Sequence, residues 1–283
     1  MKTRIITSIV GLAVLALVLV FFETPIYNLV LACVSLIAIH EAYEAFQIRC
    51  KPVFAAFIPA TLWLFLGQEL FPGSVMWPVL YLLVLFLACT VIARVHTLSF
   101  ASVSGMMMLV GMIVACFYSL LYLRSCFAQA WESLYAVLLV LAFAWGGDSC
   151  AYFAGCALGK HKLAPEVSPK KTIEGAVGGI AGSVVLGIVI TAVFSAIFGP
   201  NRLLEVYGAG YYVAIALVGA VSSVLGILGD LTASAVKRQC EIKDYGTIFP
   251  GHGGILDRFD SVMLIAPFIT ICVFLELMLE FNV

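Results

Sequence analysis

The sequence predicts an all-α, polytopic integral membrane protein with about nine transmembrane helices. Of its 283 residues, 63% are hydrophobic and only 11% are charged, and the mean hydropathy is +1.13. Soluble domains are roughly 45–50% apolar and about 25% charged. This chain has too little polar surface to cover a water-soluble globule, which excludes an ordinary soluble enzyme, a disordered protein and a secreted disulfide scaffold. The alternating hydrophobicity of a transmembrane β-barrel is also absent from the sequence.

Nine apolar runs follow one another along the chain. A hydrocarbon core of about 30 Å needs roughly 20 apolar residues per helical span. The runs cover residues 5–22, 26–43, 53–71, 75–93, 97–123, 128–147, 175–198, 209–230 and 256–279. The first run follows Lys2 and Arg4, and we expect an uncleaved span there because no A-x-A cleavage site follows it.

The positions of the basic residues predict the orientation. If the N-terminus is cytoplasmic and nine spans alternate, all but Arg124 and Arg202 of the 15 Lys and Arg residues fall on the cytoplasmic side. Cytoplasmic loops of membrane proteins carry such an excess of positive charge. The asymmetry therefore supports the count of nine and places the C-terminus outside.

The acidic residues divide the chain in a different way. All five Asp residues lie in the second half. We expect residues 1–127, with about five spans, to form a transmembrane scaffold. Residues 128–283, with about four spans, should carry the functional site on two cytoplasmic loops, 148–174 and 231–255. At the end of the second run, His40, Glu41 and Glu44 are expected to form a solvated helix end.

Small and polar residues share one face of the eighth span and its continuation. They are spaced four, three, four, four and four residues apart: Gly219, Ser223, Gly226, Asp230, Ser234 and Arg238. Such spacing puts them on one side of a helix. A carboxylate near membrane depth is costly unless it is paired or binds a cation. We therefore expect a cation or substrate site at Asp230 rather than a simple packing contact.

The segment 234–260 combines basic, acidic and glycine residues. Lys237, Arg238, Lys243 and Arg258 accompany Asp244, Asp257 and Asp260, and Gly253 and Gly254 follow His252. Glycine-rich backbone can direct several N–H groups at one anion. Carboxylates hold Mg²⁺, which in turn binds phosphate oxygens. The combination suits a nucleoside triphosphate, with Asp257 and Asp260 expected on one face at the start of the ninth helix. His252 would either contact a phosphate or act as a base.

The segment 145–175 carries basic and hydroxyl groups at the expected membrane surface. The candidate residues are Asp148, Ser168, Lys170, Lys171, Thr172 and Glu174. They suit an anionic lipid headgroup or a polyphosphate. Glu174 enters a glycine-rich span and needs a partner, which Lys170 or Lys171 could supply. We expect the glycines of that span to serve close helix packing.

Both segments resemble a known family. The segment 234–260, called the C-terminal signature below, is similar at every position to the signature of phosphatidate cytidylyltransferases, also called CDP-diacylglycerol synthases. The segment from Asp148 to Gly175 resembles the same family. It departs at Cys156, where relatives often have Arg, and at Ile173, where they often have an aromatic residue. The first five spans resemble the family only in hydropathy.

The resemblance implies a dimeric enzyme of the bacterial inner membrane whose site faces the cytoplasm. The implied reaction joins CTP and phosphatidic acid to give CDP-diacylglycerol and diphosphate. Asp230 and Asp257 would be the leading Mg²⁺ ligands, Asp260 and Asp244 would complete or orient them, and K⁺ is a candidate second cation. Lys237, Arg238, Lys243 and His252 join these as catalytic candidates. The substrate-binding candidates are Asp148, Ser168, Lys170, Lys171, Thr172, Glu174, Ser234, Gly253, Gly254 and Arg258.

Two other functions fit parts of the pattern. A CTP-dependent polyprenol or phytol kinase would also use CTP and Mg²⁺, but it would transfer the γ-phosphoryl group to an alcohol. An ion-coupled transporter would also place an Asp within the membrane. The transporter is disfavoured because the sequence has no inverted repeat and its charge gathers at one membrane face. The net charge of −1 gives no attraction to nucleic acid.

Overall fold

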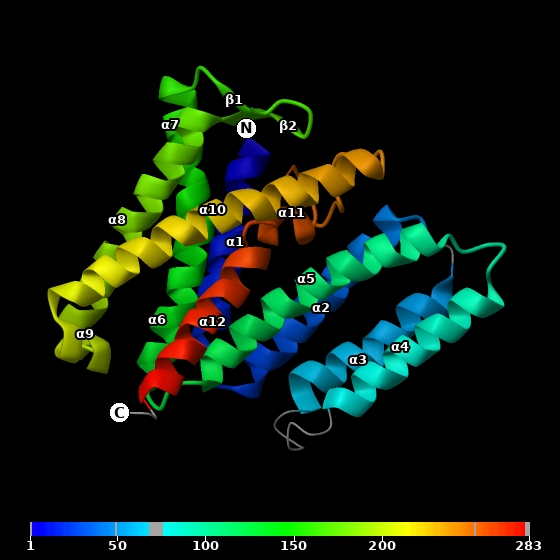
Figure 1. Ribbon diagram of the computed structural model, residues 1–283, viewed down its shortest axis with the longest axis horizontal. Coiled ribbons are helices and arrows are strands. Elements are labelled where there is room, and N and C mark those ends of the chain that lie inside the picture. The colour runs from blue at the N-terminus through cyan, green and yellow to red at the C-terminus, as the bar shows by residue number, and fades with distance from the viewer. Residues whose placement is uncertain (1, 49, 68–75, 252, 281–283) are drawn as a thin grey trace. The chain divides into compact units, whose positions relative to one another are not determined.

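The computed structural model of the protein describes residues 2–48, 50–67, 76–251 and 253–280 (Figure 1). Within them the secondary structure is helical apart from one two-stranded sheet. Two compact units make up the chain. The first unit comprises residues 1–121 and 237–259, and the second comprises residues 122–236 and 260–283. The helix that ends at Gln239 contributes residues to both units.

The first unit contains the N-terminal helices and one short helix from the C-terminal signature. They are α1 (Lys2–Val20), α2 (Pro25–Ala45), α3 (Lys51–Leu66), α4 (Met76–Ala93), most of α5 (Phe100–Ser125) and α11 (Leu256–Phe259). Proline in the first turn starts both α2 and α3, where its missing N–H group costs nothing. The two helices pack together, and the rings of His40 and Phe54 lie edge to face, 5.0 Å apart.

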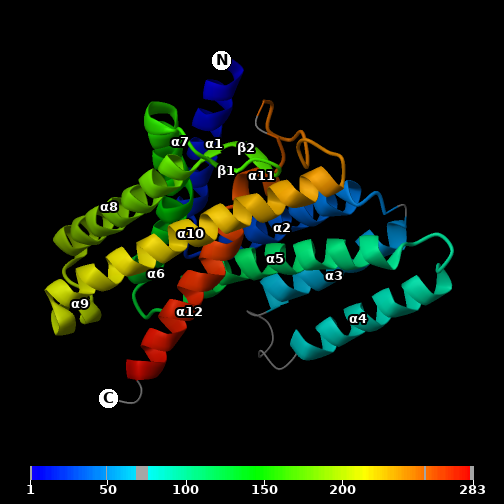
Figure 2. The ribbon, with the colours of Figure 1, turned by 45° about the horizontal axis from the view of Figure 1, so that its top comes forward.

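The second unit contains the remaining helices and the sheet (Figure 2). They are α6 (Ala130–Leu141), η3 (Ala142–Gly146), α7 (Gly147–Leu158), β1 (Lys162–Ala164), β2 (Ser168–Thr172), α8 (Ile173–Phe198), α9 (Arg202–Tyr207), α10 (Ala209–Gln239, shared with the first unit) and α12 (Val262–Glu280). The segments α6, η3 and α7 follow one another without a break, and η3 is a π-helical turn. Such turns often lie beside functional residues.

Close approach of α7 and α8 confirms the expected role of the glycines in the seventh span. Figure 1 and Figure 2 both show the two helices side by side. A Cβ atom on Gly178 would overlap the Cβ of Ala154, and one on Gly179 would lie 3.1 Å from the Cβ of Ala151. Because small residues allow backbones to approach this closely, the glycines serve helix packing.

Each of the nine apolar runs contains a helix in the described part of the chain. Five helical segments are long and apolar enough to cross a membrane: Pro25–Ala45, Phe100–Ser125, Ala130–Leu158, Ile173–Phe198 and Ala209–Gln239. Shorter apolar helices occupy α1, α3, α4 and α12. The structure therefore supports an all-α membrane protein, while the count of nine crossings and the orientation of the termini stay predictions.

The two predicted loops differ from the structure because helix and strand extend into them. The α10 helix continues to Gln239, so Lys237 and Arg238 lie on its last turn and not in a loop. The segment 148–174 begins with α7 and then forms an antiparallel hairpin in which Lys162 pairs with Thr172. Hydropathy reports where a chain leaves the membrane, whereas backbone hydrogen bonds decide where a helix ends.

The ninth span begins later than predicted. The short helix α11 ends at Phe259 and α12 starts at Val262, so Asp257 and Asp260 do not share one helix. The Asp260 side chain accepts a hydrogen bond from the Ser261 N–H group at 2.9 Å. Because such local bonds from Asp compete with helical hydrogen bonding, they account for the break between α11 and α12.

Candidate functional site

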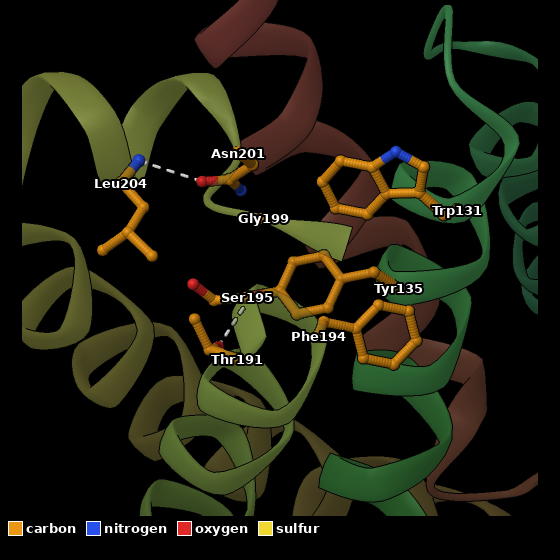
Figure 3. Close-up of a pocket in the computed structure, with 8 residues that line it drawn as sticks. All are labelled: Trp131, Tyr135, Thr191, Phe194, Ser195, Gly199, Asn201 and Leu204. Carbon is orange, nitrogen blue, oxygen red and sulfur yellow. Dashed lines mark hydrogen bonds between the residues drawn. The ribbon is translucent and has the colours of Figure 1, made fainter. Parts of the chain in front are cut away.

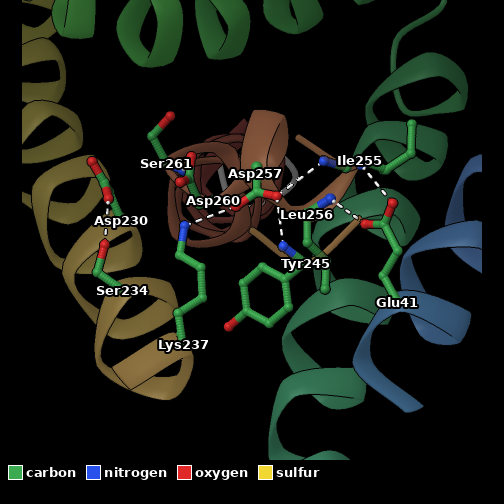
Figure 4. Close-up of polar contacts among 11 residues, drawn as sticks. Glu41, Asp230, Ser234, Lys237, Tyr245, Ile255, Leu256, Asp257, Asp260 and Ser261 are labelled. Carbon is green, nitrogen blue, oxygen red and sulfur yellow. Dashed lines mark hydrogen bonds and ion pairs between the residues drawn. The ribbon is translucent and has the colours of Figure 1, made fainter. Parts of the chain in front are cut away.

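Asp257 is the centre of a buried polar cluster in the first unit. Its side chain is 4% exposed, and Oδ1 lies 2.8 Å from the Lys237 ammonium (Figure 4). Oδ2 accepts hydrogen bonds from the Tyr245 N–H group at 2.8 Å and the Gly254 N–H group at 2.9 Å. The Lys237 ammonium also lies 5.5 Å from the centre of the Tyr245 ring. One cation and two N–H donors thus compensate the carboxylate for its loss of water.

A tight turn presents the Gly254 N–H group to Asp257. The Phe249 N–H group donates to the Gly253 carbonyl at 2.9 Å and closes the turn. Gly253 has a φ of +83°, which only glycine adopts easily, and a Cβ there would lie 2.6 Å from the Asp257 carboxylate. The turn was predicted to direct N–H groups at a phosphate, whereas in the structure the Gly254 N–H group binds the Asp257 carboxylate. His252, which lies inside this turn in the sequence, is outside the described residues.

Asp230 lies in a second cluster, which belongs to the second unit. Its Oδ2 lies 2.5 Å from the Lys171 ammonium of β2. Its Oδ1 accepts a hydrogen bond from the Ser234 hydroxyl at 3.1 Å (Figure 4). The side chains of Asp230 and Lys171 are each about one quarter exposed. Asp230 is thus paired with a cation that water can also reach, and the cation or substrate site expected there stays a prediction.

Glu174 has a different partner from the one predicted. Its carboxylate lies 2.6 Å from Nδ1 of His161 and accepts the Lys160 N–H group at 3.0 Å. The expected pairing with Lys170 or Lys171 is therefore wrong. The reason is the hairpin: the Ile173 N–H group donates to the His161 carbonyl, which brings His161 to the start of α8. Thr172 caps the same helix by accepting the Gly175 N–H group at 3.1 Å.

Asp148 is the second residue of α7 and is separated from the π-helical turn η3 by Gly147 alone. Its Oδ2 accepts a hydrogen bond from the Ser261 hydroxyl at 2.9 Å, and Ser261 is buried. Ser261 was not a predicted site residue, although it is adjacent to Asp260 in the sequence. Ser261 directly precedes α12, so this hydrogen bond connects α7 to the start of α12 within the second unit.

The other predicted site residues lie mostly at the surface. In the first unit, Arg238, Lys243, Asp244 and Arg258 are exposed. In the second unit, Lys170 is exposed and Ser168 is half-buried. The exposed cations near Asp257 in sequence are therefore reachable by an anionic ligand from water.

The comparison with known proteins decides the family. The sequence matches the cytidylyltransferase family over residues 2–276. The chain belongs to the cytidylyltransferase family. This confirms the resemblance seen in the C-terminal signature and identifies the chain as a nucleotidyltransferase.

Several relatives of this cytidylyltransferase carry a more specific name. Phosphatidate cytidylyltransferase of Bacillus subtilis is 32% identical over 275 residues, which cover 95% of this chain and 96% of the relative. The enzyme of that name from Staphylococcus aureus is 39% identical over 141 residues, about half of each chain. The one from Haemophilus influenzae is 36% identical over 138 residues, 49% of this chain and 45% of the relative.

Glu41 of this cytidylyltransferase has surroundings that its sequence did not predict. Instead of lying at a solvated helix end, Glu41 is 4% exposed and accepts the N–H groups of Ile255 and Leu256 at 2.9 Å each (Figure 4). The expectation holds for its neighbours, since the side chains of His40 and Glu44 are 53% and 63% exposed. One signal was available, because Glu41 lies on the face of α2 that carries the small residues Ala38 and Ala45.

No metal cluster is evident in the part of the cytidylyltransferase that the structure describes. Within those residues, no three His, Cys, Asp or Glu side chains form a group that could hold a metal ion. The magnesium site inferred from the family resemblance therefore stays a proposal.

A small pocket of the second unit lies at the other end of α8 from Lys171 (Figure 3). It is lined by Trp131, Tyr135, Thr191, Phe194, Ser195, Gly199, Asn201 and Leu204. Its polar groups bind each other: the Tyr135 and Thr191 hydroxyls are 2.7 Å apart, and Asn201 accepts the Leu204 N–H group at 2.9 Å. These contacts stabilise the end of α8.

Proposed function

We propose that this chain transfers the cytidylyl group of CTP to phosphatidate, giving CDP-diacylglycerol and diphosphate. The observation that carries the proposal is the match to the Bacillus subtilis phosphatidate cytidylyltransferase over nearly the whole length of both chains. The apolar helices support a lipid substrate, because an enzyme that acts on phosphatidate must reach the bilayer. We place the site at the cytoplasmic face of a bacterial inner membrane, and we propose that the protein works as a homodimer.

The chemistry requires charge neutralisation more than a strong base. A phosphate oxygen of phosphatidate attacks the α-phosphorus of CTP, the bond to the β-phosphate oxygen breaks, and diphosphate leaves. The nucleophile is already an anion at neutral pH, so the main barrier is the approach of two polyanions. Lys237, Arg238 and Lys243 would neutralise the triphosphate and stabilise the charge on the departing diphosphate.

The carboxylates suit a magnesium ion. Oxygen ligands are those that Mg²⁺ prefers, and the proposed ligands are Asp230, Asp257 and Asp260. In the described residues Asp257 already binds the Lys237 ammonium and two peptide N–H groups, so a magnesium ion would share this carboxylate with them. When bound, Mg²⁺ would supply positive charge to the triphosphate oxygens. A monovalent cation such as K⁺ beside it belongs to the same proposal.

The two basic segments would serve different substrates. The last turn of α10 carries Lys237, which contacts Asp257, and the segment after it carries Lys243; we assign both lysines to CTP. Lys170 and Lys171 lie on β2, the strand of the hairpin that leads into the glycine-rich α8. We assign them to the phosphate of the lipid.

Labelled CTP tests the reaction directly. Purified protein in mixed micelles of detergent and phosphatidate is given Mg²⁺ and CTP labelled at the α-phosphate. We expect the label to enter the lipid, with one diphosphate released per lipid labelled. A lipid kinase would transfer only the unlabelled γ-phosphoryl group and leave the label in CDP, and an ion-coupled transporter would leave the label in CTP. Either result would overturn the proposal.

A further inference from the structure

Glu41 is a buried acidic residue that the reaction chemistry above does not use. It lies in α2, 214 positions before Ile255 in the sequence, yet it contacts the C-terminal signature within the same unit. Its side chain has both oxygens engaged: Oε1 accepts the Ile255 N–H group and Oε2 accepts the Leu256 N–H group. The carboxylate thus fixes two consecutive peptide groups immediately before Asp257.

Two glycines of the signature make room for this carboxylate. A Cβ atom on Gly246 or on Gly254 would overlap the Glu41 side chain. Neither glycine has a positive φ, so the backbone conformation alone does not require glycine at these positions. The space occupied by Glu41 explains why both positions lack a side chain.

The N–H groups of three consecutive residues are shared between two carboxylates. Gly254 donates to Asp257, whereas Ile255 and Leu256 donate to Glu41 (Figure 4). Glu41 and Asp257 are close enough to repel each other electrostatically. The peptide N–H groups between them offset this repulsion, and the Lys237 ammonium offsets it further at Asp257. The two carboxylates are therefore held by neighbouring peptide groups of one short segment.

We propose that Glu41 is a positioning residue for the transfer reaction: it holds the turn 253–256 so that Asp257 and Lys237 keep the geometry that catalysis needs. This inference rests on the proposed function. An apolar residue at position 41 could fill the same space without burying a charge, but it would leave the two peptide N–H groups without acceptors, at a cost that a buried carboxylate avoids. Glu41 is not expected to touch either substrate.

Kinetics of a near-isosteric variant test the positioning role. Glu41→Gln keeps the size of the side chain but replaces one acceptor oxygen by an NH₂ group, so only one of the two peptide N–H groups keeps its partner. We expect kcat to fall about tenfold or more, the effect of losing one charge-assisted hydrogen bond. The apparent KM for phosphatidate should stay within about twofold. Glu44→Gln, one turn further along α2 and exposed, is the matched control and should match the parent in both constants.

A second experiment tests the contact without any substrate. Thermal unfolding in detergent is measured for Gly246→Ala, for Glu41→Ala and for the double variant. We expect Gly246→Ala to lower the unfolding temperature in the parent but to have little further effect in the Glu41→Ala background, because the smaller side chain removes the overlap. This non-additivity is required by the contact and does not depend on which reaction the protein catalyses.

The two experiments separate failure of the inference from failure of the proposed function. If the parent does not convert phosphatidate but the unfolding cycle is non-additive, the contact is correct and the proposed function fails, and with it the positioning role. Additive unfolding effects would overturn the inference, whatever the activity. Unchanged kcat in Glu41→Gln, in a parent that makes CDP-diacylglycerol, would overturn it as well.

Discussion

At the residue scale, Asp230 and Asp257 have the same proposed role but different surroundings. Asp257 is buried with three donors, whereas Asp230 is about one quarter exposed and pairs with Lys171. Breaking a buried ion pair by removing one charge costs far more than breaking one that water can reach. The two aspartates can therefore be separated by stability even if both are essential for activity.

The first prediction uses this difference. We expect Asp230→Asn and Asp257→Asn each to abolish turnover, because both remove a carboxylate that we assign to Mg²⁺. Asp257→Asn should also lower the free energy of unfolding by about 3 kcal/mol or more, whereas Asp230→Asn should change it by about 1 kcal/mol or less. Radiolabel transfer and denaturant unfolding in detergent provide the two measurements. Activity close to that of the parent at limiting Mg²⁺ would remove the affected residue from the metal site.

The residues of the signature could be predicted from the sequence, but the residues that support them could not. Asp257 and Lys237 stand in a dense pattern of charged and glycine residues, so composition alone draws attention to them. Glu41 and Ser261 form hydrogen bonds with residues far away in the sequence, Ile255 and Asp148. The residues next to them in the sequence do not indicate these partners. The identity of such partners depends on tertiary packing, which a local pattern does not contain.

At the scale of elements, apolar runs predicted the existence of the helices but not their ends. The α10 helix continues to Gln239 because its backbone hydrogen bonds persist after the hydropathy falls. The hairpin β1–β2 was missed because its strands are short and polar and are joined by backbone hydrogen bonds. Both errors concern basic residues that were expected in loops. Lys237 lies on the last turn of a helix, and Lys170 and Lys171 lie on a strand.

The second prediction concerns these two elements. We expect Lys237→Ala or Lys243→Ala to raise the apparent KM for CTP, and Lys170→Ala or Lys171→Ala to weaken mainly the dependence on phosphatidate. Each lost charge-assisted contact should correspond to roughly 1.5–3 kcal/mol, or about 10- to 150-fold. Kinetics with each substrate varied at saturating concentration of the other provide the measurement. Loss of CTP affinity in the two hairpin variants, with the phosphatidate dependence unchanged, would contradict this division.

The third prediction concerns the packing of α7 against α8. Gly178→Ala places a methyl group on Ala154, so the two helices must separate, and we expect a destabilisation of about 1–3 kcal/mol. Gly111→Ala in α5 is the matched control, since a Cβ atom at Gly111 meets no atom within 4 Å. There the better helix propensity of alanine should leave stability equal or raise it by about 1 kcal/mol or less. Equal unfolding temperatures for both variants would argue against tight packing of these helices.

At the scale of the whole molecule, the orientation in the membrane decides which substrates the site can meet. CTP is found in the cytoplasm, so the basic end of α10 must face that side if the proposed function is correct. The excess of Lys and Arg predicts this orientation. Two cysteines lie at suitable positions: Cys126 follows α5 and Cys240 follows α10, and both are partly buried.

The fourth prediction tests the orientation with single-cysteine variants, in which Cys126 or Cys240 is the one cysteine left. Cys126 should react with an impermeant maleimide in intact cells or spheroplasts, whereas Cys240 should react only after permeabilisation. Burial raises the pKa of the Cys240 thiol. Less thiolate is then present at neutral pH, so its labelling should be slow and should accelerate as the pH rises. Permeabilised samples labelled across a range of pH establish that Cys240 can react at all. Labelling of Cys240 from outside, in intact cells that keep a cytoplasmic marker unlabelled, would reverse the orientation and would place the signature on the side of the membrane without CTP.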